Sequence, residues 1–433
     1  MCFFRKSTQP TRTRAEIIPS RVGAGKSVAH TLPWALLTLW VLGARASCGY
    51  GADEAVSVES VGGKTHTGAL AELTADQLVI RGAMGGTIPM ADVVRIDWPG
   101  RRVASLSGQN LVLLANGDRI VADPVQTDND ILRAKWRDFA GLPLLSIPLE
   151  MVQGIAWKLS QDRTLRSRVI TRLLDHAAKT DLLTLKNGNS VSGQFVEFDT
   201  DALQIDTAAG PLKINHDSLS SLAFNPELIA FPELEGMRVI TTLIDGSRFT
   251  ATQFQFKPDS GIEFTTAFGG QVTVAVDRVA SMQVGGGRAI YLSDLKPHRY
   301  TFTPSLSLHW PLRADRDVTG ESLRLGGREF AKGLGTHSQA EIAYDLDGQY
   351  GHFQALVGID DDAGPQAHAI AEVFIDGELV WTSEPLMSGH PPQRIASLDV
   401  TGAHTLTLRV QFGDWGDVQD HVNWCDALLV RRP

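Results

Sequence analysis

The chain has 433 residues, of which 43% are hydrophobic and 21% are charged, with 41 glycines and 20 prolines. At roughly 100–200 residues per domain, this length predicts two to four globular units, and the apolar fraction is too high for a disordered chain. The 49 acidic side chains outnumber the 40 basic ones and give a formal net charge of −9. This balance argues against nucleic acid or an anionic membrane surface as the main partner.

Residues 1–46 have the features of a secretory signal peptide. A basic stretch precedes an apolar run over 32–43, and the small-residue site Ala-Arg-Ala follows at 44–46. About 12 apolar residues are too few to span a bilayer with ~30 Å of hydrocarbon. We therefore expect cleavage after residue 46 and an exported protein that is periplasmic, on the cell surface or extracellular. Membrane retention through this segment and lipidation at Cys48 are the alternatives.

Residues 55–284 contain one short sequence pattern four times. The clearest copy begins at 185–193 (LKNGNSVSG), and moving back 125 residues places Gly63 and Gly68 on Gly188 and Gly193. Asn-Gly, Asp-Gly and Gly-Gly between alternating apolar residues predict two-residue β-hairpin turns with positive φ at both central residues. Each copy is therefore expected to form four or five short strands.

The other two copies begin at the turn sequences 116–118 (NGD) and 245–247 (DGS). We place β-repeats one and two in 55–158 and β-repeats three and four in 181–284. A unit of some 45 residues is marginally stable alone, so the copies either close individually into small barrels or pack side by side.

Between the second and third copies, residues 159–180 have a helical pattern. Leu165, Val169 and Leu173 recur at helical spacing. We expect one linking helix here. Its arginines form either a solvated face or a basic contact face; they are Arg163, Arg166, Arg168 and Arg172.

Three glycines at 285–287 end the last copy, and short alternating runs separated by turns fill 289–433. Asp376-Gly377 between two such runs predicts a hairpin turn. This length and punctuation are typical of one β-sandwich. The predicted fold class is thus all-β: an array of small β-barrel-like repeats followed by a C-terminal sandwich. Cys425 lies in a predicted core strand of the sandwich, where we expect a buried free thiol.

The C-terminal region resembles the NPCBM family, which is related to family 51 carbohydrate-binding modules. The motifs that carry the resemblance are 325–337 (LGGREFAKGLGTH), 344–348 (YDLDG), 353–361 (FQALVGIDD), 373–377 (VFIDG) and 420–427 (DHVNWCDA). The resemblance implies a jelly-roll-like sandwich that recognises galactose-type sugars on glycans. Because one fold hosts many functions, the binding itself has to be argued from the site.

Sugar binding needs a flat apolar face for the ring and planar polar groups for its hydroxyls. Trp415 lies in the glycine-flanked loop 413–416 (GDWG) and is the first candidate for an exposed platform. Trp381 follows a predicted strand and is a weaker candidate, and for both the alternative is a packing role. Trp424 is a further candidate, although its apolar strand pattern favours the core.

Five polar residues of the same motifs are candidates to bond sugar hydroxyls or to hold the loops: His337, Asp360, Asp361, Asp420 and Asn423. His337 matches the histidine of the family motif, and a structural role fits it equally well.

The acidic loops suggest one metal. Because Ca²⁺ takes six to eight oxygen ligands and tolerates irregular loops, a structural calcium at Asp362, Asp414 and Asp417 is a candidate. Solvated acidic turns are the alternative, and no other cofactor is indicated.

Signatures of zinc proteases, serine hydrolases and P-loop enzymes are absent from the sequence. We predict a non-catalytic carbohydrate-binding protein that attaches to glycan or polysaccharide. One alternative is a scaffold whose repeats bind other proteins through sheet edges. A second is a glycoside hydrolase within 55–284, because glycosidases need only two carboxylates at a set separation in space.

Overall fold

The computed structural model describes residues 55–136, 144–304 and 309–432. The expected signal peptide and Cys48 lie outside these residues. The described chain is nearly all β-structure, which confirms the predicted fold class. Within these ranges, no helix combines the length and the hydropathy that a membrane crossing needs.

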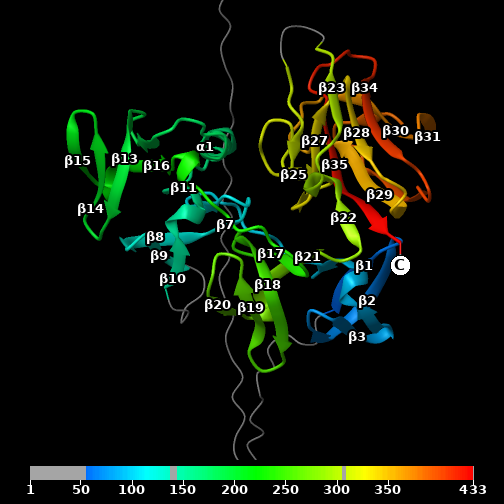
Figure 1. The fold of residues 1–433 in the computed structure, drawn as a ribbon, viewed down its shortest axis with the longest axis horizontal. Coiled ribbons are helices and arrows are strands. Elements are labelled where there is room, and N and C mark those ends of the chain that lie inside the picture. Colours follow the sequence, from blue (N-terminus) through cyan, green and yellow to red (C-terminus); the bar gives the residue numbers. More distant parts are fainter. Residues whose placement is uncertain (1–54, 137–143, 305–308, 433) are drawn as a thin grey trace, which may run out of the picture. The chain divides into compact units, whose positions relative to one another are not determined.

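Four successive segments share one plan of strands with a 3₁₀ turn before the last strand (Figure 1). Repeat one contains β1 (Ala55–Ser60), β2 (Lys64–Leu73), β3 (Gln77–Met84), β4 (Gly86–Pro89), η1 (Met90–Asp92) and β5 (Val93–Asp97). Repeat two contains β6 (Leu111–Leu114), β7 (Arg119–Ile120), β8 (Ala122–Asp128), β9 (Ile131–Trp136), β10 (Leu145–Pro148), η2 (Leu149–Met151) and β11 (Val152–Ala156).

The second pair of repeats follows the same order. Repeat three contains β12 (Asp181–Leu185), β13 (Ser190–Phe198), β14 (Ala202–Thr207), β15 (Gly210–Asn215), η3 (His216–Ser218) and β16 (Leu219–Ala223), and η4 (Pro226–Leu228) follows it. Repeat four contains β17 (Arg238–Leu243), β18 (Arg248–Lys257), β19 (Gly261–Thr266), β20 (Gln271–Val274), η5 (Val276–Arg278) and β21 (Val279–Gly285).

In repeats one and three, a glycine in the second strand lets the unit curl. In repeat three, β13 pairs with β12 up to Gly193 and with β14 from Gln194 onward. A Cβ on Gly193 would collide with the carbonyl oxygen of Asp206, and a Cβ on Gly68 would collide with that of Arg81. The side chain is therefore missing where one strand passes from one neighbour to the next. The fifth strand then returns to pair with the first.

The hairpin turns differ from the prediction in detail. In the turns 116–118, 187–189 and 245–247 only the glycine has positive φ. The Asn or Asp before the glycine instead uses its side chain: Asn187 Oδ1, for example, accepts from the Asn189 N–H at 3.0 Å. This Asx hydrogen bond stabilises a different turn. Positive φ at both central residues occurs at Gly62-Gly63, at Asn129-Asp130 and, as predicted, at Asp376-Gly377.

The repeats are both curled and paired, so the two arrangements that the sequence left open coexist. The last strands of repeats one and four pair through β5 and β21, and those of repeats two and three pair through β11 and β16. One hydrophobic cluster runs through all four repeats, from Val56 to Val284. Since a 45-residue unit buries little apolar surface, this shared core supplies what each unit lacks.

The helix α1 (Arg163–Leu174) covers the paired strands of repeats two and three. Asp162 caps its N-terminus by accepting from the Leu165 N–H at 2.9 Å. Leu173 is buried against Ala156 and Ala223, which belong to β11 and β16.

The C-terminal segment is a sandwich of two antiparallel sheets. One sheet has the order β24-β27-β35-β29-β33 with β22 on β35, and the other has the order β23-β28-β34-β30-β31 with β32 on β30. A separate hydrophobic cluster lies between them and includes Trp424 and Phe353. The elements are β22 (Ala289–Tyr291), η6 (Leu292–Asp294), β23 (Arg299–Phe302), β24 (Arg313–Ala314), β25 (Leu323–Leu325), β26 (Arg328–Phe330), β27 (Gly333–His337), β28 (Ala340–Asp345), β29 (Tyr350–Ile359), β30 (His368–Ile375), β31 (Glu378–Thr382), β32 (Leu386–Met387), β33 (Gln393–Asp399), β34 (Thr405–Phe412) and β35 (His421–Arg431).

The sandwich contacts the repeats through a charged junction centred on Glu329. Its Oε1 lies 2.6 Å from Nη2 of Arg119 and 3.9 Å from Nη1 of Arg248. The two arginines come from equivalent turns of repeats two and four and bond each other's turn, Arg119 to the carbonyl of Gly246 and Arg248 to that of Gly117. Burial alone would raise the pKa of Glu329, but the charges of Arg119, Arg248 and Arg324 outweigh it and lower the pKa to about 2.

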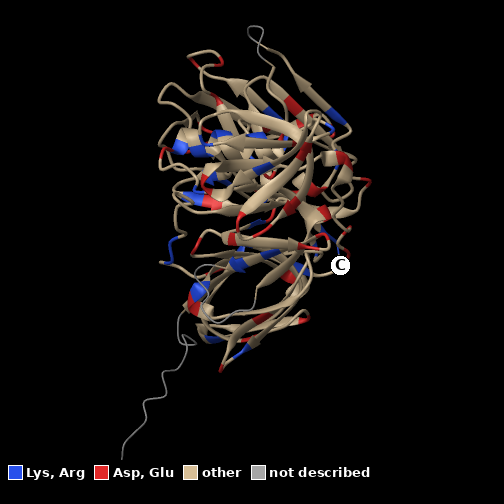
Figure 2. Ribbon diagram, turned by 90° about the vertical axis from the view of Figure 1, so that its left-hand side faces the viewer, with Lys and Arg blue, Asp and Glu red and all other residues tan. Residues whose placement is uncertain are grey.

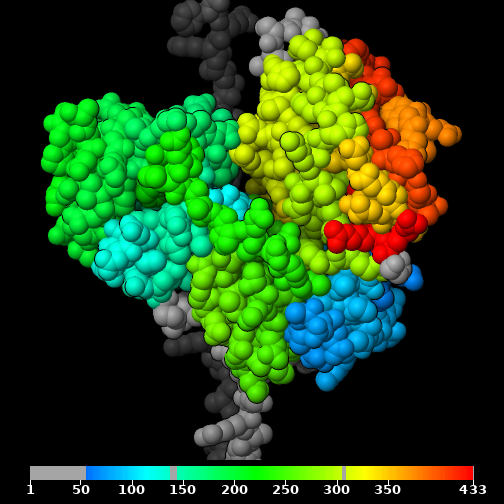
Figure 3. All heavy atoms as spheres, viewed as in Figure 1, coloured from blue at the N-terminus to red at the C-terminus, as the bar shows by residue number. Residues whose placement is uncertain are grey.

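An apolar contact continues this junction. Val61 and Val94 of repeat one pack with Leu428 and Val430 of β35, and the Tyr291 hydroxyl donates to the Val94 carbonyl at 3.3 Å. In Figure 3, the red atoms at the end of the chain accordingly lie next to the blue atoms of repeat one. The repeats and the sandwich are therefore packed against each other over polar and apolar surface.

Candidate functional site

Three connections of the sandwich meet at one end, which we call the loop end. They are 338–339 between β27 and β28, 360–367 between β29 and β30, and 413–420 between β34 and β35. The strand register brings them together, because His337 pairs with His421 and Ile359 pairs with Val422. The antiparallel sheets thus collect on one end most of the motifs singled out in the sequence.

An aromatic and imidazole group lies at the loop end. The ring of Trp310 stacks on the ring of His337, with centroids 4.9 Å apart and planes 5° apart. His421 is next to both, 5.7 Å from His337 and 5.4 Å from Trp310. His337 is almost completely buried, whereas His421 and Trp310 are half-buried.

Both imidazoles are held neutral. Burial and the neighbouring His421 lower the pKa of His337 to about 4, and burial lowers the pKa of His421 as well. A neutral imidazole has one N–H donor and one ring nitrogen acceptor. The two imidazoles can therefore both donate a hydrogen bond to a neutral polar ligand and accept one from it, without adding charge to the site.

Asp420 and His368 lie beside this group with unused hydrogen-bonding capacity. Asp420 Oδ1 accepts from the His368 N–H at 2.9 Å, while Asp420 Oδ2 and His368 Nε2 are buried without a partner among the described residues. Burial raises the pKa of Asp420 to about 6, against the opposing hydrogen bond from His368. Since buried polar groups are normally paired, these atoms mark a place for a hydroxyl or a water molecule.

Asp360, Asp361 and Asn423 hold the loops. Asp360 accepts from Asn423 Nδ2 and from the Arg324 N–H, and Asp361 accepts from Gly326 and Gly327 N–H at 2.8 and 2.7 Å. Burial and the nearby Asp317 raise the pKa of Asp360 to about 7. These hydrogen bonds hold the loops in place, and a bond from either aspartate to a sugar hydroxyl stays a prediction.

The three candidate tryptophans have different positions. Trp415 is 66% exposed in the loop 413–420. Trp381 pairs with Val373, five residues along β30 from His368, which places it about 16 Å from the loop end at ~3.3 Å per residue. Trp424 is completely buried in the core, so its interpretation as a sugar-contacting residue is wrong.

The three aspartates proposed for calcium do not form a cluster. Asp362 is ion-paired with Arg163 of α1, and the Asp414 side chain is 86% exposed. In the described ranges, no three His, Cys, Asp or Glu side chains come close enough to hold a metal ion. The expected calcium site is therefore not formed at these residues, because Asp362 is ion-paired with Arg163 and the three carboxylates are not gathered around one point.

Sequence reasoning missed Trp310, His368 and His421. His421 is the neighbour of Asp420 in a quoted motif, so its strand position opposite His337 was the available signal. Trp310 and His368 lie outside the quoted motifs, and only the folded chain brings them to the loop end. Cys425 is a free buried thiol, as expected.

Acidic residues occur among the basic ones along the ribbon in Figure 2, and the formal net charge is −9, which disfavours a polyanionic ligand. The loop end combines an exposed indole, two neutral imidazoles and unpaired buried polar atoms. Such a combination suits a neutral ligand that has an apolar face and several hydroxyls.

Comparison with known proteins identifies the family of the C-terminal segment. A family model described as the NPCBM/NEW2 domain matches residues 288–430. These residues form an NPCBM domain. It is similar to the solved CBM51 of Clostridium perfringens GH95 in complex with methyl-galactose, with 29% identity over 33% of this chain and 99% of that chain and a TM-score of 0.30.

Two further proteins are similar to parts of the chain. The CBM51-2 and INT domains of Clostridium perfringens ZmpB, solved with GlcNAc, are 27% identical over 42% of this chain and 40% of that chain, with a TM-score of 0.30. A curated protein of Renibacterium salmoninarum named "Putative endo-alpha-N-acetylgalactosaminidase" is 26% identical over 198 residues, which are 43% of this chain. The match covers 13% of the length of that relative.

Proposed function

We propose that the protein is exported and binds glycans, without catalysing a reaction, through the loop end of its NPCBM domain. The observation that carries the proposal is the presence in this domain of an exposed Trp415 on the same loop end as the neutral imidazoles of His337 and His421. The indole offers the apolar face for a sugar ring, and the imidazoles with Asp420 offer bonds to hydroxyls. The role is attachment to glycan or polysaccharide, with a galactose-type sugar as the ligand that the family resemblance favours.

A hydrolase is the second candidate, because the Renibacterium relative is named as a glycosidase. Carboxylates with raised pKa often mark catalytic acids, and Asp360 and Asp420 have this property. Both are buried, however, and both accept hydrogen bonds from strand backbone, Asp360 from Arg324 of β25 and Asp420 from His368 of β30. Burial is the first cause of both pKa shifts, so the raised pKa of these carboxyl groups needs no catalytic role to explain it.

The decisive experiment is a glycan-array screen of the full chain and of Trp415→Ala. Leu228→Ala is the matched control, since Leu228 is an equally exposed apolar residue that lies far from the NPCBM domain in the chain. We expect selective binding by the wild type and by Leu228→Ala, and strongly weakened binding by Trp415→Ala with an unchanged melting temperature. Binding that Trp415→Ala leaves intact would place the ligand elsewhere, and a folded wild type without any ligand would favour the scaffold alternative.

A further inference from the structure

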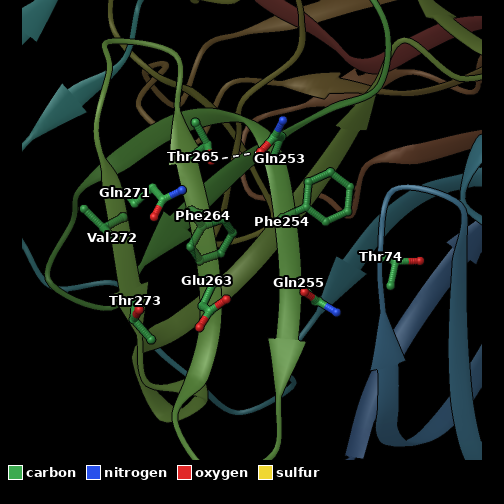
Figure 4. Close-up of a pocket in the computed structure, with 10 residues that line it drawn as sticks. All are labelled: Thr74, Gln253, Phe254, Gln255, Glu263, Phe264, Thr265, Gln271, Val272 and Thr273. Carbon is green, nitrogen blue, oxygen red and sulfur yellow. Dashed lines mark hydrogen bonds between the residues drawn. The ribbon is translucent and has the colours of Figure 1, made fainter.

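A hollow of about 420 Å³ lies on repeat four, outside the NPCBM domain. Three strands, β18, β19 and β20, form its floor, and Thr74 in the turn between β2 and β3 of repeat one reaches its rim (Figure 4). Its size is within the range of ~300–1,000 Å³ of small-molecule sites.

The floor is a regular lattice of polar side chains. The strand register forms two rows across the three strands. The rows are Gln253, Thr265 and Gln271, and Gln255, Glu263 and Thr273. The alternate residues Phe254 and Phe264 are buried in the core of the repeat and fix the strands below. Neighbouring strands are ~4.8 Å apart, so each row presents three polar groups over about 10 Å.

Most of this polar surface is unused by the protein. Thr265 donates to Gln253 at 3.3 Å. No side-chain hydrogen bond to another described residue is found for Gln255, Glu263, Gln271 or Thr273. The lining contains one carboxylate and no lysine or arginine, which disfavours an anionic ligand.

On the equivalent surface of repeat three, polar side chains pair with each other. The register places Glu197, Gln204 and Lys213 where repeat four has Gln255, Glu263 and Thr273. Lys213 and Glu197 form an ion pair at 3.8 Å. The polar surface of repeat four, with one carboxylate and no lysine or arginine, therefore differs from the ion-paired surface of repeat three, although both repeats share one strand plan.

We infer that this hollow is a second binding site for a neutral, hydroxyl-rich glycan chain. The planar amides of Gln255 and Gln271 and the carboxylate of Glu263 can each bond two neighbouring hydroxyls. Without an exposed aromatic ring, the site is weak alone. Two weak sites on one polymer chain gain avidity, so the repeats would strengthen attachment through the NPCBM domain. This last step rests on the proposed function, whereas the hollow itself does not.

The test is affinity electrophoresis of the full chain in gels that contain neutral galactan, neutral dextran or anionic polygalacturonate. The variants are Gln255→Ala/Gln271→Ala, Trp415→Ala and the combination of all three. Gln194→Ala/Gln204→Ala on the equivalent surface of repeat three is the matched control. All four glutamines lie on strand surfaces where substitutions change stability by about 0.5 kcal/mol or less.

We expect the double glutamine variant to bind a neutral polymer at least tenfold more weakly than the wild type and than the control. Trp415→Ala should keep a residual retardation that the triple variant loses. Wild-type affinity of the double variant for every neutral polymer overturns the second site. Complete loss of retardation in Trp415→Ala also overturns the second site. That result would agree with the proposed glycan site in the NPCBM domain. Retardation that depends on the glutamines but not on Trp415 supports the hollow and contradicts the proposed function.

Discussion

Replacing Glu329 by glutamine should remove the charge that joins Arg119 and Arg248 of the repeats to the NPCBM domain. A pKa of about 2 in place of an ordinary 4.5 corresponds to about 3 kcal/mol of stabilisation of the folded chain when the carboxylate is ionised. The shift lowers the folded pKa, so this stabilisation is present above pH 4.5 and is lost as the pH falls toward 2. At pH 3 about 1.5 kcal/mol should remain.

The assay is urea unfolding of wild type and Glu329→Gln at pH 7 and at pH 3, followed by tryptophan fluorescence. The control is Glu341→Gln, which removes an exposed ion pair with Arg299 and should cost at most about 1 kcal/mol. The reasoning is refuted if Glu329→Gln costs less than about 0.5 kcal/mol at pH 7. If Glu329→Gln lowers the unfolding free energy by the same amount at both pH values, the reasoning is also refuted. The destabilisation would then come from altered packing and not from the lost charge.

Three further predictions concern other parts of the chain. Because the pKa of Asp360 is raised to about 7, its contribution to unfolding free energy should fall by about 3 kcal/mol as pH rises from 4 to 7, and Asp360→Asn should flatten this slope in pH-dependent urea unfolding. Gly193→Ala should destabilise the chain by about 1–3 kcal/mol through collision with the Asp206 carbonyl, whereas Gly86→Ala, where a Cβ meets nothing, should leave the melting temperature unchanged. Arg163→Ala frees Asp362 in the loop 360–367 and should weaken glycan binding several-fold by calorimetry, with Arg168→Ala as the control; equal affinity of the two variants would show that the helix does not position this loop.

The repeats were visible in the sequence because their glycines have steric reasons to recur. Gly68 and Gly193 are 125 residues apart and occupy the same crossing of one strand between two neighbours. The pairing of repeat one with repeat four and of repeat two with repeat three was not visible. The pairing depends on which repeats join through their last strands. These strands have similar apolar patterns, so the sequence does not show which of them pair.

The turn geometry shows a similar limit. Asn-Gly and Asp-Gly predicted hairpins, and hairpins are found, but in three repeats the Asn or Asp side chain bonds the backbone two residues on. The glycine alone then needs positive φ. The same dipeptide supports both turns, so the dipeptide fixes the presence of the hairpin and the flanking strand register fixes its type.

The same ambiguity decides how much of the binding site could be predicted. An aspartate in a glycine-rich loop can bond a ligand or cap a turn, and the outcome depends on which N–H groups lie within reach. Asp361 finds the two N–H groups of Gly326 and Gly327, and Asp360 finds Arg324. Asp420 accepts from the His368 N–H, and its Oδ2 has no partner among the described residues. The sequence can therefore name the acidic loops, but only the folded backbone shows which aspartate oxygens accept hydrogen bonds from the protein and which have no partner among the described residues.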